Sequence, residues 1–104
     1  MLHFELLPGV NTPIEHIVGD IRYLASENDP SPLREQFDKA YSFGGGWMPM
    51  NGFTMKDNCI CYPGDPALKP LAKAEFRDQT VYVYPHAWVA IVEKDGSFEV
   101  SIMD

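Results

Sequence analysis

The chain has 104 residues, of which 45% are hydrophobic and 22% are charged. These values are typical of a globular protein and argue against a disordered or fibrous chain, and the length predicts a single domain over residues 1–104. The formal net charge is −7, and the acidic residues are scattered without any basic stripe. The composition therefore argues against nucleic acid and anionic membranes as partners, since both need clustered basic residues.

The amino terminus has no basic region and no small-residue cleavage site, so we expect no signal peptide. No apolar run approaches the roughly 20 residues of a membrane span. The chain has 2 cysteines, too few for a disulfide framework. Together these features predict a cytoplasmic protein with reduced thiols.

A first helix is predicted to start at Thr12-Pro13, after a short apolar strand over Leu2–Leu7. Thr12 can accept hydrogen bonds from the free amides of the first turn, Pro13 suits the first helical position, and Glu15 completes a capping box. Apolar residues then recur at helical spacing, which predicts a helix that ends near Asn28. The predicted buried stripe consists of Ile14, Ile17, Val18, Ile21, Leu24 and Ala25.

A second helix is predicted from Ser31-Pro32 to Gly44, where a glycine ends the helical pattern. Beyond it the periodicity becomes that of strands, and Lys56-Asp57-Asn58 and Lys94-Asp95-Gly96 have the composition of hairpin turns. The segment Leu71–Phe76 fits either a strand or a short helical turn. The buried face of the second helix is predicted to hold Leu33, Phe37, Ala40 and Tyr41. The predicted strands are Gly52–Met55, Cys59–Tyr62, Thr80–Tyr84, His86–Val92 and Ser97–Met103.

This order of elements predicts an α+β fold. Two amino-terminal helices would pack on one face of a mostly antiparallel sheet of about 4–6 strands. Because two helices cover only one face, we expect no predicted element on the other face, which therefore needs the long loop, another subunit or a partner to cover it. That face would carry Tyr82, Tyr84 and Trp88, aromatic residues that are favoured at interfaces. The sequence therefore predicts a contact surface there, for a protein partner or for a second copy in a homo-oligomer.

The glycine-rich stretch Gly44-Gly45-Gly46, followed by Trp47, is the second predicted binding element. Ordering three glycines is entropically costly, so a folded domain keeps them where the backbone passes close to something. With Phe53, this loop would form the rim of the binding surface; the alternative is a helix end that leads into a packed loop. The stretch lacks the glycine spacing of a dinucleotide fingerprint and the Gly-Lys-Ser/Thr of a phosphate loop.

Cys59 and Cys61 are separated by one residue, so on a strand both thiols lie on the same face. A structural zinc site needs four ligands, and His3, His16 and His86 are isolated from one another in the sequence. We therefore expect no metal site. An internal disulfide would be strained, because the Cα atoms lie near the upper limit for a bridge. Since free cysteines are often buried, we expect both to pack in the core.

The Pro63-Gly64-Asp65 turn, followed by a strand that begins at His86, resembles part of the papain-like cell-wall amidases and peptidases. The resemblance implies a cysteine hydrolase in which Cys59 or Cys61 is the nucleophile and His86 the base. In those enzymes the cysteine lies at the start of a helix, well ahead of the turn. Here both cysteines directly precede the turn in a strand-like run.

The sequence favours a small, acidic, non-enzymatic binding or interaction domain with no cofactor. Its size and acidity would also fit an accessory protein of a phage or mobile element. Two alternatives stay open: the cysteine hydrolase, and a protein that sequesters a small ligand beneath the glycine loop. The predicted binding residues are Gly44, Gly45, Gly46, Trp47, Phe53, Tyr82, Tyr84 and Trp88.

Overall fold

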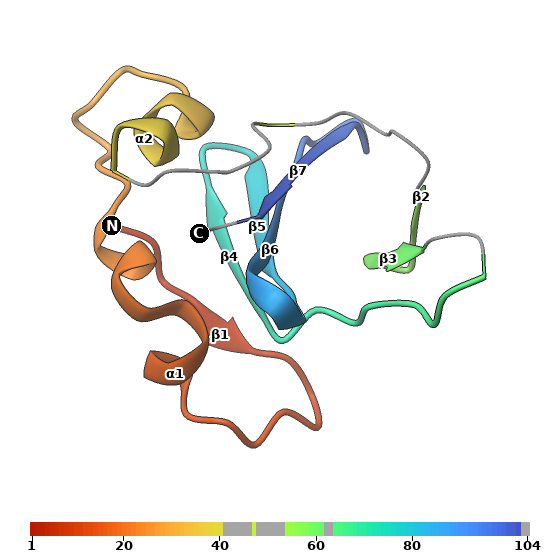
Figure 1. The fold of residues 1–104 in the computed structure, drawn as a ribbon. Coiled ribbons are helices and arrows are strands. Elements are labelled where there is room, and N and C mark those ends of the chain that lie inside the picture. Colours follow the sequence, from red (N-terminus) through yellow and green to blue (C-terminus); the bar gives the residue numbers. More distant parts are fainter. Residues whose placement is uncertain (41–46, 48–53, 62–63, 103–104) are drawn as a thin grey trace.

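The computed structural model describes residues 1–40, 47, 54–61 and 64–102. A sheet lies in the middle of the molecule, with the helices on one side of it and a two-stranded hairpin on the other (Figure 1). The predicted α+β fold, with two helices near the amino terminus and an antiparallel sheet, is confirmed. No helix among the described residues has the length and apolar character needed to cross a membrane.

The central sheet contains β1 (Glu5–Leu6), β4 (Ala72–Phe76), β5 (Gln79–Val83), β6 (Trp88–Val92) and β7 (Phe98–Ile102). The strands follow the order β1-β4-β5-β6-β7, and every neighbouring pair is antiparallel. Arg77 and Asp78 join β4 to β5 with φ values of 51° and 65°, the left-handed geometry that matches the twist of a tight hairpin. The ambiguous segment from residue 71 to 76 thus contains a strand.

A separate hairpin is formed by β2 (Thr54–Lys56) and β3 (Cys59–Cys61). Its two-residue turn is Asp57-Asn58, with φ values of 51° and 64°, so the turn composition predicted this hairpin correctly. Ile60 and Leu68 exchange two main-chain hydrogen bonds, at 3.0 and 2.9 Å. These bonds tie the hairpin to the segment that leads back into the sheet.

The helical elements are α1 (Ile14–Val18), the 3₁₀ helix η1 (Gly19–Tyr23) and α2 (Leu33–Ala40). The prediction of one helix to Asn28 is wrong, because Gly19 adopts a φ of 50° and ends α1 after five residues. The capping box is also absent: no side chain caps α1, and Thr12 is exposed. The predicted apolar stripe nevertheless packs on one side, with Val18, Ile21 and Ala25 buried. The stripe of the first helix was therefore predicted better than its ends.

Helix α2 buries Leu33 and Phe37, as predicted. Ala40 is exposed instead of buried, and Tyr41 lies outside the described residues. Gln36 takes the third inward position of the helix, where its amide can satisfy nearby main-chain groups.

The two faces of the sheet have separate cores. On the helix side, apolar residues of the strands pack against Leu2 and the helices. On the other side the expectation that no predicted element lies on the face is wrong, because the β2–β3 hairpin and Leu68 cover it. Tyr82 and Tyr84 are only 8% and 1% exposed. The hairpin was predicted from its turn, but its position over the sheet depends on long-range packing that the local pattern does not contain.

Candidate functional site

The β3 strand places the two cysteines on the same face of the hairpin. Ile60 lies between them and is fully buried against the sheet, so the cysteines point the other way. Both are half-buried, and the prediction that they pack in the core is wrong. The Cys59 Sγ lies 3.6 Å from the Asp57 carbonyl oxygen, and the Cys61 Sγ lies 3.8 Å from the Cys59 carbonyl oxygen.

His86 lies elsewhere, in the 3₁₀ turn η2 (Pro85–Ala87) between β5 and β6. It is exposed and has a φ of 67°. No hydrogen bond joins His86 to Cys59 or Cys61. Within the part of the chain that the structure describes, no three His, Cys, Asp or Glu side chains gather as metal ligands. The hairpin therefore places the two thiols on one face, and neither thiol is hydrogen-bonded to the histidine.

Trp47 packs against helix α2. Its ring lies 5.8 Å from that of Phe37, centroid to centroid, and its Nε1 donates a hydrogen bond of 2.7 Å to Asp38. These contacts join Trp47 to the helix-side core. The other predicted loop residues, Gly44-Gly45-Gly46 and Phe53, lie outside the described residues.

Tyr84 fastens the hairpin to the sheet. Its hydroxyl donates a hydrogen bond of 2.7 Å to the carbonyl oxygen of Asn58, in the β2–β3 turn. Burial, with smaller effects from Tyr82 and Cys59, raises the pKa of the Tyr84 hydroxyl far above its ordinary value, which keeps the group protonated as a donor. Trp88 is half-buried and packs against the same core. Tyr82 and Tyr84 present little surface to a partner.

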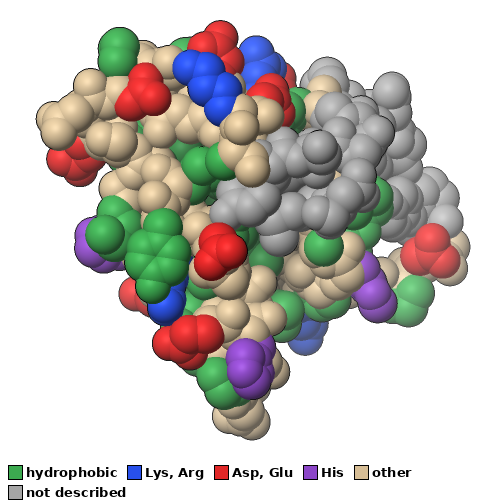
Figure 2. All heavy atoms as spheres, turned by 60° about the vertical axis from the view of Figure 1, so that its left-hand side comes forward, with side chains coloured by type: hydrophobic (Ala, Val, Ile, Leu, Met, Phe, Trp, Pro, Cys, Tyr) green, Lys and Arg blue, Asp and Glu red, His purple; other side chains and the backbone are tan. Residues whose placement is uncertain are grey.

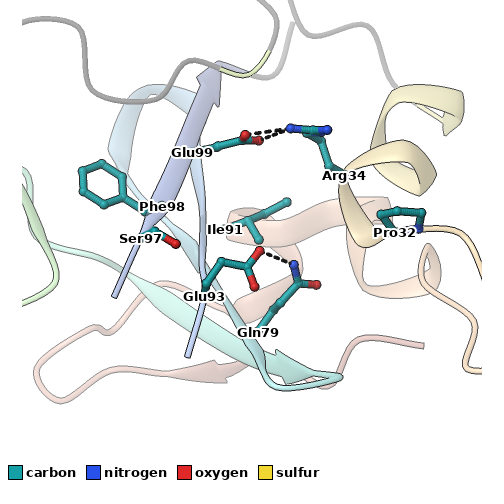
Figure 3. A pocket seen from close by; sticks show the side chains of 8 residues that line it. All are labelled: Pro32, Arg34, Gln79, Ile91, Glu93, Ser97, Phe98 and Glu99. Carbon is teal, nitrogen blue, oxygen red and sulfur yellow. Dashed lines mark hydrogen bonds and ion pairs between the residues drawn. The ribbon is translucent and has the colours of Figure 1, made fainter. Parts of the chain in front are cut away.

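The end of the sheet that carries the β4–β5 turn and the β6–β7 loop is hollowed in two adjoining places; we call it the turn end. The first hollow, of about 360 Å³, opens between α2 and the sheet (Figure 3). There Arg34 reaches both carboxylate oxygens of Glu99 at 2.7 Å, and Gln79 donates a hydrogen bond of 2.7 Å to Glu93. The ion pair raises the pKa of the Arg34 guanidinium. Arg34 is thus already engaged within the chain.

The second hollow of the turn end, of about 440 Å³, shares Gln79 with the first. It is lined by the acidic side chains of Glu27, Glu75 and Asp78, and by Lys94. None of the three carboxylates forms an ion pair with another described residue. They are therefore free to accept hydrogen bonds from an outside partner.

Arg77, which also lines the second hollow, directs its donors into the protein. Its guanidinium lies over the Phe76 ring, 4.7 Å from the centroid. Its donors are used by main-chain oxygens of the loop between η1 and α2, while Gln36 binds the same loop by accepting from the Ser26 amide and donating to the Ser31 carbonyl. The carbonyl oxygens that accept from Arg77 belong to Ser26, Glu27, Asp29 and Ser31.

The sequence analysis missed the turn end. The order of the strands could have predicted it, because every second connection in a meander of antiparallel strands lies at the same end of the sheet. The connection at Arg77-Asp78 and the predicted turn at Lys94-Asp95-Gly96 had to be neighbours for this reason. The contribution of Glu27 could not be found in this way, since it depends on how the helical layer docks.

Acidic side chains also occur over the helix-bearing side of the molecule, where Figure 2 shows them spread among fewer Lys and Arg side chains. Comparison of the chain with protein-family models, with curated proteins and with solved structures gives no match.

Proposed function

We propose that this protein is a small, non-enzymatic interaction domain that binds a basic surface of another protein through its turn end. One observation carries the proposal. Glu27, Glu75 and Asp78 are exposed at the turn end, where the guanidinium groups of Arg34 and Arg77 are engaged within the chain and Lys94 leaves the carboxylates in excess. A Lys or Arg side chain of a partner can pair with these carboxylates.

The charge of the whole chain supports the same partner class. The formal net charge is −7, and three of the basic side chains are used in internal ion pairs. A field of this sign speeds the encounter with a positively charged protein and repels other acidic molecules. The pairs are Arg22–Glu15, Arg34–Glu99 and Lys73–Glu5.

A charge-neutral variant of the turn end tests the proposal. The triple variant Glu27→Gln, Glu75→Gln and Asp78→Asn keeps the shape of the side chains, and asparagine tolerates the left-handed φ of residue 78. The matched control is Asp20→Asn, Asp57→Asn and Asp65→Asn, which makes the same change in net charge at exposed positions elsewhere.

Partners captured from the producing cells by the wild-type protein are identified, and their affinity is measured at several salt concentrations. We expect a basic partner whose affinity falls with salt and is at least about tenfold weaker for the turn-end variant, a loss of about 1.4 kcal/mol. The control variant should retain most of the affinity. An equal loss of affinity in both variants would show that binding depends on the net charge of the chain alone, and would contradict a binding site at the turn end.

The cysteine hydrolase and the aromatic interface gain no support from the described residues, and the small-ligand alternative stays a prediction because its glycine loop lies outside them. A cysteine hydrolase needs a base close to its nucleophile, and neither thiol is hydrogen-bonded to His86. Self-association through Tyr82 and Tyr84 was expected because no element was predicted on their face, and the hairpin covers that face.

A further inference from the structure

The β2–β3 hairpin carries a pair of thiols that the proposed function does not use. In the register of the hairpin, Lys56 lies opposite Cys59 and Thr54 lies opposite Cys61. These four residues share the outer face of the hairpin, while Ile60 points to the core. Both cysteines are free, and neither residue is fully buried.

The backbone that carries the thiols is held at several points. Ile60, between the two cysteines, is fully buried and exchanges main-chain hydrogen bonds of 3.0 and 2.9 Å with Leu68. Just before Cys59, the carbonyl oxygen of Asn58 accepts the hydrogen bond from the Tyr84 hydroxyl. The spacing of the two cysteines is therefore set before any ligand arrives, which lowers the entropic cost of binding.

The separation of the two cysteines suits a metal ion held between the sulfur atoms better than a disulfide bond. Two residues of a strand span about 6.7 Å from Cα to Cα, at the upper end of the range for a disulfide. A metal–sulfur bond of about 2.3 Å places two sulfurs on opposite sides of an ion about 4.6 Å apart. Both sulfurs now lean toward the turn. Rotation of Cys59 about its Cα–Cβ bond turns its sulfur toward Cys61.

We infer that Cys59 and Cys61 form a two-coordinate site for a soft monovalent metal ion of the Cu(I) type. Thiolate ligands select such ions, whereas zinc takes four ligands and the described residues supply no third His, Cys, Asp or Glu here. Binding replaces two S–H protons, which leave to solvent, with two metal–sulfur bonds. The product carries one negative charge, and the Lys56 ammonium across the hairpin offsets it.

The reduced full-length protein is titrated with Cu(I), without oxygen and in the presence of a competing chelator. We expect one ion per chain, an ultraviolet absorption band from thiolate-to-metal charge transfer, and protection of both cysteines from alkylation, read by mass spectrometry. Cys59→Ser and Cys61→Ser should each weaken binding at least about 100-fold, because one thiolate cannot replace two. The charge-neutral turn-end variant should bind Cu(I) like the wild type, which separates this site from partner binding.

Circular dichroism of the serine variants checks that they fold, and the alkylation experiment on the wild type does not depend on them. Three results would overturn the assignment. They are unequal protection of the two thiols, a ratio of one ion to two chains together with a dimer in light scattering, and Zn(II) binding as tightly as Cu(I). The variant Lys56→Gln should weaken Cu(I) binding several-fold while Lys69→Gln, an equal charge change at another exposed lysine, should not.

Discussion

The two faces of the sheet are covered in different ways. The helix side is a large, mainly apolar core, in which Phe37 of α2 and Val89 of β6 are fully buried and Gln36 is a buried polar residue. On the hairpin side the core is smaller and includes two tyrosines, and a hydrogen bond from Tyr84 to the main chain of the hairpin supplements the apolar contacts. A cover of two three-residue strands buries little apolar area, so it depends on specific polar contacts.

The two faces should therefore differ in their contribution to the free energy of unfolding and in how readily they open locally. Loss of a side chain from the helix side should weaken the whole fold, since the helices and all the long strands meet there. Loss of a contact on the hairpin side should free the hairpin first, because only a few residues hold it. The predictions below test this contrast.

The largest effect is expected from Phe37→Ala on the helix side. Its ring is fully buried and packs against Trp47, so the change leaves a large cavity. We expect a loss of about 3–5 kcal/mol in the free energy of unfolding. Denaturant titration followed by circular dichroism measures it; a loss no greater than that for a hairpin residue would contradict the contrast between the two faces.

A smaller and more local effect is expected from Ile60→Ala. The side chain is fully buried, and truncation should cost about 2–3 kcal/mol, near the low end for such a change because the small hairpin can open locally. Hydrogen exchange should show faster exchange of the Ile60 and Leu68 amides, with little change in β5 and β6. Uniform acceleration over the sheet would show that the hairpin and sheet unfold together.

Tyr84→Phe should cost about 1–2 kcal/mol, because it removes the donor to the Asn58 carbonyl oxygen without creating a cavity. The pKa of Tyr84 is higher in the folded state than in the unfolded chain, where it is about 10. Its contribution to stability is therefore complete below pH 10 and is lost as the pH rises above that value.

Unfolding of the wild type and the Tyr84→Phe variant should be compared from pH 8 to pH 11. The difference between the two free energies of unfolding should shrink above about pH 10, because Tyr84 then ionises in the unfolded wild-type chain. The other tyrosines and the lysines titrate in both proteins, so their effects cancel in the difference. A constant difference across this range would mean that the Tyr84 hydroxyl ionises alike in the folded and unfolded states.

The smallest effect is expected from Thr12→Ala. The sequence pattern predicts a loss of about 1 kcal/mol for this change, through the capping box. The structure shows an exposed Thr12 and no side-chain cap on α1, so we expect a change of less than about 0.5 kcal/mol. A shift of the denaturation midpoint equivalent to about 1 kcal/mol would show that Thr12 does cap the first helix.

Local patterns predicted much of the fold, but little of the candidate sites. The turn at Asp57-Asn58 and strands β5 and β7 follow from turn chemistry and alternation over a few residues, whereas the pattern of β4 left strand and helical turn both open. The first helix was predicted too long because its apolar stripe continues past Gly19, while the backbone there turns to a positive φ. The contacts of Arg77 with the loop before α2 join residues about fifty positions apart, and no local pattern contains them.

Which residues share a face follows from the order of the amino acids: the apolar stripe of the first helices, and the two cysteines on one side of Ile60. These relations follow from the fixed periods of helices and strands. Which face packs against which surface depends on contacts between elements that are distant in the sequence. Ile60, Tyr82 and Tyr84 became a core, and the cysteines an outer face, because the Ile60 face also carries Met55, whereas the cysteine face carries Lys56, whose charge would be costly to bury.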